Sequence, residues 1–232
     1  MTQAEYDLCR DIKKLEAAAL ATRAISERRF RLFALGCTLR VLQFLTRPAI
    51  FQVIESALLF ADGLATNERL HEGWLAVRDA ASKAPSSSKW DEALRVVLYA
   101  TTPSDKFSKA FFSDRVAVCV CRAIDLDENS ESYSFEVSET YQREMARCCE
   151  MFRDLFPYHA PHQPSSPPHW TGGDVAHVAR AIYEENRFED MPVLADALED
   201  AGCDDLGLIA HCRQTGLHIR GCWAVDLTLG MK

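Results

Sequence analysis

Side chains that can bind metals or catalyse reactions gather near the end of this 232-residue chain. Those with thiol or imidazole groups are Cys203, His211, Cys212, His218 and Cys222. Zinc prefers four such nitrogen or sulfur ligands in a tetrahedron. The spacing departs from the usual zinc pattern, because no Cys pair two to four residues apart opens the segment and because adjacent helical residues such as His211 and Cys212 point about 100° apart. The leading expectation is therefore that the chain binds no cofactor, and the alternative is that it binds zinc.

The same segment also holds the residue types of nucleophilic catalysis. A Cys beside a His that is oriented by a carboxylate is the arrangement that activates a thiol. Cys212 or Cys222, with His218 and with Asp204 or Asp226, supplies these groups. A metal-dependent or cysteine-based, hydrolase-like enzyme is therefore the alternative function.

The competing interpretation is that these side chains pack in the interior and carry out no chemistry. Cys203 follows a glycine that can end a helix, and Cys212 would face a neighbouring helix. Cys222 and Trp223 would pack together, since a free Cys behaves as a small hydrophobic residue. In this interpretation His218 donates a hydrogen bond to a carbonyl group.

A non-catalytic role in protein binding is the function that we expect first. The partner, another protein, would bind in a groove between the helix at 190–201 and the segment at 211–223. Its anchors would be Arg213, His218, Arg220 and Trp223. Arg and Trp concentrate binding energy where they are partly desolvated. The chain would then be an interaction or adaptor domain.

Two other sets of histidines have spacings that suit metal binding. Glu68 with His71, and Asp174 with His177, each place a carboxylate and an imidazole on one helix face, as in dinuclear centres of helical bundles. Acidic residues are also expected at these helix starts because they complement the helix dipole. A proline-rich stretch adds His159, His162 and His169. Its prolines favour an extended path that keeps these three rings apart.

The overall charge disfavours a general nucleic-acid-binding surface. The formal net charge is −8 and the pI is about 5.4, whereas nucleic-acid-binding proteins concentrate basic residues. A weaker alternative is nucleic-acid binding through a basic helix that carries Arg28, Arg29, Arg31, Arg40 and Arg47. Such arginines more often pair with acidic neighbours.

Composition indicates a folded, reduced protein. Hydrophobic residues make up 48% of the chain, which is enough for a continuous core without disulfides. The nine cysteines are odd in number and lie mostly in apolar helical runs, so we expect free thiols. The N-terminal residues lack a signal-peptide pattern, and no window of about eighteen residues is continuously apolar. We expect a cytoplasmic protein without a membrane partner.

The patterning predicts an all-α fold, a multi-helix bundle with short C-terminal helix pairs. Thr2 and Glu5 form a capping-box signature for a helix that runs to about residue 24. Ser26 precedes a second helix, which has basic ends, is apolar on nearly every side after Arg31 and should be central. Pro48 suits the first turn of a third helix, and Thr66 opens a fourth helix that ends near residue 83.

Three further helices are predicted at 88–101, 103–124 and 138–156. The short segment from Ser132 to Val137 is the one β candidate. Five prolines between residues 157 and 170 predict an extended linker.

The C-terminal part is predicted to be a set of short helices. They begin near Thr171 and Asp190, after Asp204, and near Gly221. The expected organisation is an N-terminal bundle, a Pro/His-rich linker and a C-terminal helical module, at 1–156, 157–170 and 171–232. We expect the module to pack on the bundle as one compact unit.

Several motifs resemble an uncharacterised bacterial helical family that occurs in many paralogous copies, chiefly in planctomycetes. The motifs include Arg29 to Ala34, Phe60 to Thr66, Phe152 to Phe156, Pro192 to Cys203, His211 to Arg213 and His218 to Trp223. The resemblance implies kinship and no particular activity. The segment from Leu194 to Glu199 is also similar to a short helical module that accompanies repeat proteins in the same bacteria, which implies a binding role. Relatives differ at 157–169, where this chain carries His159 and His162.

Overall fold

The computed structural model describes residues 1–22, 26–109, 112–126, 138–158 and 171–231. Every regular element within these residues is a helix, and none of them is a strand. The predicted all-α class is therefore confirmed. No helix in this part of the chain is long and apolar enough to cross a membrane.

The chain divides into two compact units, residues 1–152 and 153–232. Helix α8 (Glu139–Leu155) begins in the first unit, and its last turn belongs to the second. The predicted linker at 157–170 falls outside the described residues except for its first two positions. The predicted β candidate and the proline-rich histidines also lie outside them: Ser132 to Val137, His159, His162 and His169.

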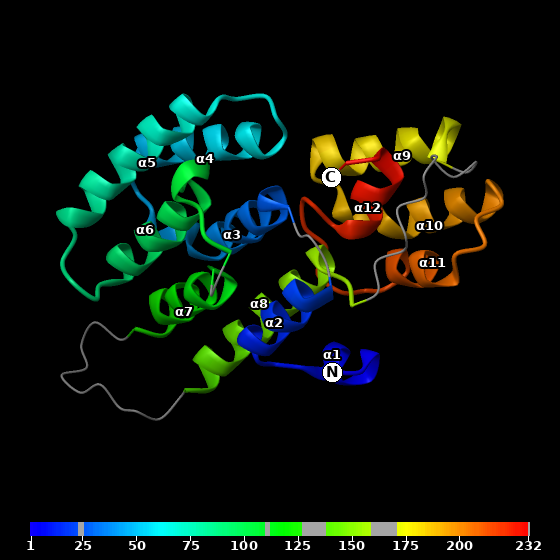
Figure 1. The fold of residues 1–232 in the computed structure, drawn as a ribbon, viewed down its shortest axis with the longest axis horizontal. Coiled ribbons are helices and arrows are strands. Elements are labelled where there is room, and N and C mark those ends of the chain that lie inside the picture. Colours follow the sequence, from blue (N-terminus) through cyan, green and yellow to red (C-terminus); the bar gives the residue numbers. More distant parts are fainter. Residues whose placement is uncertain (23–25, 110–111, 127–137, 159–170, 232) are drawn as a thin grey trace. The chain divides into compact units, whose positions relative to one another are not determined.

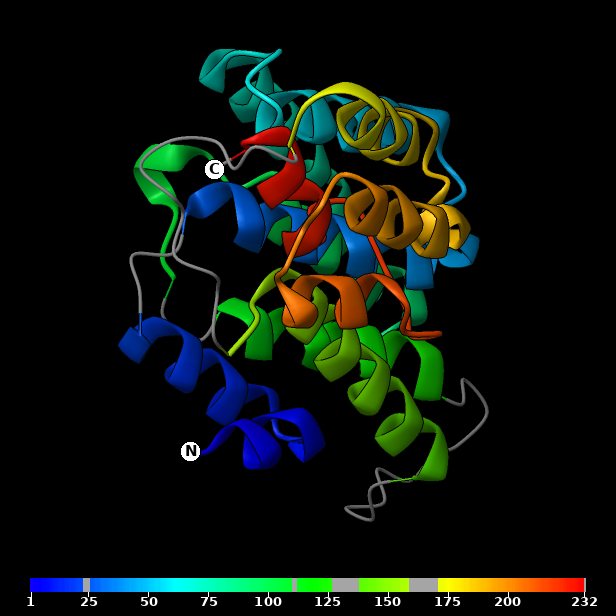
Figure 2. The same cartoon turned by 90° about the vertical axis from the view of Figure 1, so that its right-hand side faces the viewer.

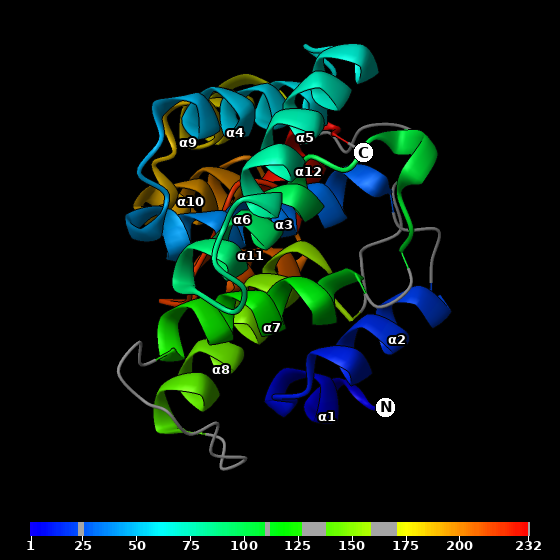
Figure 3. The same cartoon turned by 90° about the vertical axis from the view of Figure 1, so that its left-hand side faces the viewer.

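The first unit is built around one apolar helix. Its helices before α8 are α1 (Gln3–Leu8), α2 (Ile12–Thr22), α3 (Glu27–Val41), α4 (Pro48–Ala61), α5 (Asn67–Ser82), α6 (Lys89–Ala100) and α7 (Phe112–Asp125). Helix α3 packs against α4, α6 and α7 (Figure 1). Most of its residues are buried, as predicted for a central helix. Helix α6 lies between α5 and α7, as Figure 3 shows.

The predicted helix from Thr2 to about residue 24 is wrong in one respect, because it is two helices. Helix α1 ends where the Cys9 N–H donates to the Tyr6 carbonyl and the Cys9 backbone becomes extended. The Asp11 carboxylate then accepts hydrogen bonds from the Lys13 and Lys14 N–H groups, at 3.0 and 3.3 Å. These bonds cap the first turn of α2. The Asp11 cap therefore starts a second helix where the sequence pattern predicts one continuous helix.

The predicted helix at 103–124 is also interrupted. A single 3-10 turn, η2 (Ser104–Lys106), is followed by extended backbone at Phe107 and by non-helical backbone to residue 109, and the described part of α7 is Phe112–Asp125. The Phe107 ring packs 4.9 Å from the Phe112 ring and 6.2 Å from the Phe30 ring. This aromatic cluster accounts for the break, because it holds Phe107 against α3 in an extended conformation.

One charged side chain is fully buried in the first unit. The Arg31 guanidinium donates to the carbonyl groups of Ala100 (2.6 Å) and Thr102 (2.8 Å) and pairs with Glu27. The Phe60 ring lies 4.9 Å from its central carbon. Arg31 therefore ties α3 to the end of α6 through fixed backbone acceptors.

The described residues of the second unit form four α-helices after α8 and an apolar core of their own. After the end of α8 these are α9 (Gly173–Glu185), α10 (Met191–Asp200), α11 (Leu206–Cys212) and α12 (Trp223–Leu229). Figure 2 shows them in yellow to red, with α9 packed on α10 and α12, and α10 on α11. Side chains at the centre of the core are Val175, Ile182, Leu194, Leu198, Leu208 and Cys212. Short predicted helices after Asp204 and near Gly221 are confirmed as α11 and α12.

Candidate metal centre

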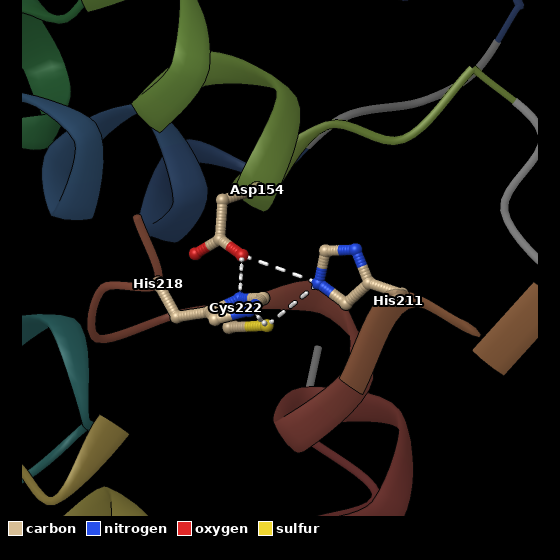
Figure 4. A group of neighbouring side chains, drawn as sticks. All are labelled: Asp154, His211, His218 and Cys222. Atoms are coloured by element: carbon tan, nitrogen blue, oxygen red, sulfur yellow. Dashed lines mark hydrogen bonds and ion pairs between the residues drawn. The ribbon is translucent and has the colours of Figure 1, made fainter. Parts of the chain in front are cut away.

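Four metal-type side chains from four segments of the second unit point toward one another. Asp154 lies in the last turn of α8, and His211 lies in the last turn of α11. His218 belongs to the connection that follows, and Cys222 is the N-cap residue of α12. Figure 4 shows the carboxylate, the two rings and the thiol around a common point. Their nearest donor atoms all lie within 4.8 Å of one another.

The individual distances place the Asp154 carboxylate against both rings. Its Oδ1 atom lies 2.7 Å from His218 Nδ1 and 3.2 Å from His211 Nε2. The Cys222 Sγ atom lies 3.2 Å from His211 Nε2 and 3.8 Å from His218 Nδ1. Each ring therefore turns a single nitrogen toward both the carboxylate and the thiol.

This use of one nitrogen per ring decides between two kinds of chemistry. In a nucleophile–His–acid relay, the nucleophile and the carboxylate bind opposite nitrogens of the imidazole. Here Asp154 and Cys222 contact the same nitrogen of His211, and again the same nitrogen of His218. The arrangement suits four donors around a shared cation better than proton relay through a ring.

A tight turn brings Cys222 back to His218. The Cys222 N–H donates to the Ile219 carbonyl at 2.9 Å, which closes a turn over 219–222. Gly221, at the third position of this turn, has a φ of +93°, a conformation that favours glycine. The same carboxylate holds the other end, because the Ile219 N–H donates to Asp154 Oδ2 at 2.9 Å.

Neighbouring groups also fix the two rings. His218 Nε2 lies 3.4 Å from the Gln214 carbonyl, so an N–H at Nε2 would leave Nδ1 free to accept or to bind a cation. The His211 ring packs against the Trp223 and His218 rings, each with a centroid separation of 4.8 Å. The orientations of both imidazoles are thus supported from outside the cluster.

The electrostatics of the cluster are those of an anion surrounded by titratable partners. Burial alone would raise the pKa of Asp154, but hydrogen bonds from His211 and His218 outweigh it and leave the pKa below its ordinary value. Burial would lower the pKa of His218, and the Asp154 carboxylate reverses this and raises the pKa above 6.5. Burial and the Asp154 charge raise the pKa of the Cys222 thiol well above 9.0.

Three of the five metal ligands considered from the sequence come together, and two do not. His211, His218 and Cys222 are in the cluster. Cys212 is fully buried in the core of the second unit, and Cys203 is buried at the edge of the same core. For Cys212, helical geometry explains the difference from His211, because adjacent positions on α11 face directions about 100° apart.

Asp154 is the member of the cluster that the sequence prediction missed. It lies 64 residues before His218. A signal was present, however, because Asp154 occupies the last turn of a helix among apolar residues such as Phe152 and Leu155. A carboxylate in the last turn of a helix interacts unfavourably with the helix dipole, and its burial among apolar residues costs free energy. Asp154 therefore requires a specific partner.

The four predicted partner-binding anchors do not share one exposed surface. Trp223 is only 8% exposed and belongs to the core. His218 is in the cluster, and the Arg220 guanidinium lies 4.4 Å over the Tyr183 ring. Arg213 is half exposed and pairs with two acidic side chains of α10.

The other sequence candidates do not form comparable centres. Among the described residues, the cluster is the one group of three or more converging metal-type donors. His71 packs near Trp74, with ring centroids 5.9 Å apart, and His177 is exposed on α9. Three arginines of the basic helix have acidic partners: Arg28 with Asp62, Arg31 with Glu27 and Arg40 with Glu144.

The fold and the cluster define an all-α protein whose C-terminal unit carries four converging metal-type donors. Comparisons of the chain with protein-family models, with curated proteins and with solved structures found no match.

Proposed function

We propose that the C-terminal unit binds one transition-metal ion, preferably zinc, and that this ion has a structural role. The observation that carries the proposal is the convergence of four donor atoms from four segments within 4.8 Å. Asp154, His211, His218 and Cys222 would be the ligands. No other described part of the chain offers a comparable set.

The chemistry of the donors favours zinc. Two imidazole nitrogens, one thiolate and one carboxylate oxygen are all ordinary zinc ligands, and four of them fill its tetrahedral shell. Calcium and magnesium prefer oxygen ligands and larger coordination numbers, so a set with one carboxylate suits them poorly. The Gln214 carbonyl beside His218 and the Ile219 N–H on Asp154 resemble the outer contacts that orient metal ligands.

The closed surroundings favour a structural ion over a catalytic one. The side chains of Asp154 and His218 are 3% and 5% exposed, that of His211 is 14% exposed, and Cys222 is fully buried. Catalytic zinc keeps a position open for water or substrate, whereas structural zinc has four protein ligands. The alternative of a cysteine nucleophile is further weakened because burial and Asp154 keep the Cys222 thiol protonated by raising its pKa.

A structural ion would connect separate segments of the second unit. It would tie the end of α8 to α11, to the connection at 213–222 and to the start of α12. A structural ion takes no part in catalysis, so this role is compatible with the non-catalytic, protein-binding function expected from the sequence. The protein partner and a cytoplasmic location remain part of the proposal.

Metal content and cobalt spectroscopy test the proposal directly. We expect about one zinc ion per chain in protein purified without chelators, measured by elemental mass spectrometry. Replacement by Co(II) is expected to give the visible absorption of a tetrahedral site and one thiolate-to-cobalt charge-transfer band. A chain that takes up no zinc or cobalt would contradict the proposal.

Matched variants separate ligands from bystanders. We expect Cys222→Ser to abolish the charge-transfer band, and Cys222→Ser and His218→Ala to weaken zinc binding by at least about tenfold in a competition titration with a chelator. The controls are Cys212→Ser, which alters a buried thiol of the same unit, and His177→Ala, which alters an exposed imidazole. Equal losses in the control variants would indicate general unfolding and would contradict the ligand assignment.

A further inference from the structure

A polar pocket of about 400 Å³ opens between α6 and α7 in the first unit. These two helices pack directly on each other, as Figure 3 shows. The wall from α6 includes Glu92 and Tyr99, and the wall from α7 includes Arg115, Cys119 and Arg122. The pocket lies in a different unit from the metal cluster, so its function is independent of zinc.

The floor of the pocket holds a buried carboxylate that has an unused acceptor. Glu92 is only 4% exposed, and its Oε2 atom is buried and accepts no hydrogen bond from the described residues. Its Oε1 atom lies 3.6 Å from Arg122 Nη1, which is longer than a hydrogen bond. A buried carboxylate oxygen without a donor is costly, and Oε2 therefore identifies a place where a ligand can donate.

The rest of the pocket wall carries three arginines together with two carboxylates, those of Asp91 and Asp114. Arg122 is half exposed, and Arg115 is exposed on the same helix. Arg95, the third arginine, is already held by Asp91 through its Nε and Nη2 atoms, at 3.3 and 3.2 Å. Arginine binds carboxylates through two parallel N–H groups, so Arg115 and Arg122 are suited to an anionic group.

The pocket contains a thiol, but its surroundings suppress thiol chemistry. Burial, together with the nearby Glu92 carboxylate, raises the pKa of Cys119 to about 12. The thiol therefore stays protonated at neutral pH and is a poor nucleophile. The pocket is suited to binding and not to covalent catalysis.

We propose that this pocket binds a small zwitterion of the α-amino acid class. The ammonium group would donate to Glu92 Oε2 at the floor, and the carboxylate would be bound by Arg115 and Arg122 at the opening. The volume lies near the lower end of ligand pockets, about 300–1,000 Å³, which suits a molecule of this size. A free cation would give Arg115 and Arg122 no ligand carboxylate to bind, and a free anion would leave Glu92 Oε2 without a donor.

Saturation-transfer NMR on the full chain tests the proposal. The probes are the twenty proteinogenic L-amino acids, with methylammonium and acetate as single-charge comparisons. We expect at least one amino acid to show saturation transfer, and we expect both single-charge probes to bind at least about tenfold more weakly. Absence of transfer to all twenty amino acids, or equal binding of methylammonium or acetate, would overturn the proposal.

Two variants and a control locate the bound molecule. Glu92→Gln keeps the shape of the side chain and removes its charge, and Arg122→Ala removes one half-exposed cation at the opening. Each is expected to weaken binding by at least about tenfold, because each removes a charged hydrogen-bond partner. Glu72→Gln, at an exposed position on α5, should bind like the unmodified protein.

Stability separates a ligand-binding role of Glu92 from a structural one. Because its free oxygen is unsatisfied, Glu92→Gln should melt at the same temperature as the unmodified protein or higher. Unchanged amino-acid binding in both Glu92→Gln and Arg122→Ala would overturn the proposal. A lower melting temperature for Glu92→Gln with unchanged binding in Arg122→Ala would do the same.

Discussion

The two units bury charge in different ways. In the first unit, the Arg31 cation is bound by the carbonyl groups of Ala100 and Thr102, which do not titrate, and by one carboxylate, that of Glu27. In the second unit, the Asp154 anion is surrounded by two imidazoles and a thiol, each of which can gain or lose a proton. Both charges are almost completely inaccessible to water.

This difference shows what each buried charge is able to do. The Arg31 guanidinium keeps its charge, so its bonds to the two carbonyl groups need no exchange of protons or metal. The groups around Asp154 can gain or lose protons. The positive charge that compensates the Asp154 carboxylate can therefore come either from protons on the two histidine rings or from one metal ion. The comparison therefore predicts that stability depends on metal in the second unit and not around Arg31.

Removal of the permanent cation should have the largest effect. Arg31→Ala leaves two buried carbonyl groups without their donors, and loss of one partner from a buried charged network costs about 3–5 kcal/mol. We expect this loss in the free energy of unfolding of the first unit, measured by urea denaturation. It should be the same with zinc and with chelator, and a zinc-dependent loss would contradict the comparison.

Removal of the metal should have the next largest effect, confined to the second unit. Zinc present at 100 times its dissociation constant stabilises the folded state by about 2.7 kcal/mol, and chelation should remove that amount. Thermal unfolding followed with and without chelator measures the difference. Cys222→Ser should show little response to chelator, whereas the control Cys212→Ser should respond like the unmodified protein.

The response to pH should have opposite signs in the two metal states. In the metal-free protein, the lowered pKa of Asp154 stabilises the fold above its ordinary value of 3.8, and this contribution is lost as the pH falls through the lowered pKa. The raised pKa of His218 stabilises the fold below 6.5, and this contribution is lost as the pH rises through the raised pKa. The metal-free unit should therefore be most stable in weakly acidic solution.

The metal-loaded protein should instead gain stability as the pH rises. Zinc displaces the proton of Cys222 and any proton of His218, so its affinity increases with pH by about 1.4 kcal/mol per pH unit for each proton released. Unfolding measured between pH 5.5 and 8, with zinc and with chelator, tests the two slopes. Parallel slopes would indicate that the cluster does not exchange protons for metal.

The sequence predicted the helices well where local signals acted alone. The cap at Thr66 and the proline at Pro48 predicted the starts of α5 and α4, because the bonds that begin a helix are local. The interruptions at Cys9 and Phe107 were missed. At Phe107 the reason is tertiary, since packing against Phe30 and Phe112 outweighs the helical pattern.

The cluster of Asp154, His211, His218 and Cys222 was predicted in part, again because local signals acted alone. His211, His218 and Cys222 are close in sequence, so their residue types alone indicated a metal-binding alternative. Asp154 belongs to another segment, and only the fold places it beside His218. Cys212 was included among the predicted ligands because its residue type does not show which way its side chain points. In the structure, α11 directs this side chain into the core.

The smallest effect on stability and zinc affinity is expected for a substitution of Arg213, which follows His211 and Cys212 in the chain. Its Nη2 atom lies 3.1 Å from Asp196 Oδ1 and 2.5 Å from Glu199 Oε2, and all three side chains are between 44% and 70% exposed. Water and salt screen such pairs, in contrast to the buried partners of Arg31 and Asp154. Arg213→Ala should therefore leave the denaturation midpoint and the zinc affinity unchanged within error.

A large loss of zinc affinity in Arg213→Ala would contradict this contrast, because it would show that an exposed ion pair orients α11 and thereby His211. Repeating the titration at low and high salt distinguishes the two cases. If the ion pair does not position His211, the variant and the unmodified protein should have identical zinc affinities at both salt concentrations. A pair that positions His211 predicts a difference that shrinks as salt weakens the interaction in the unmodified protein.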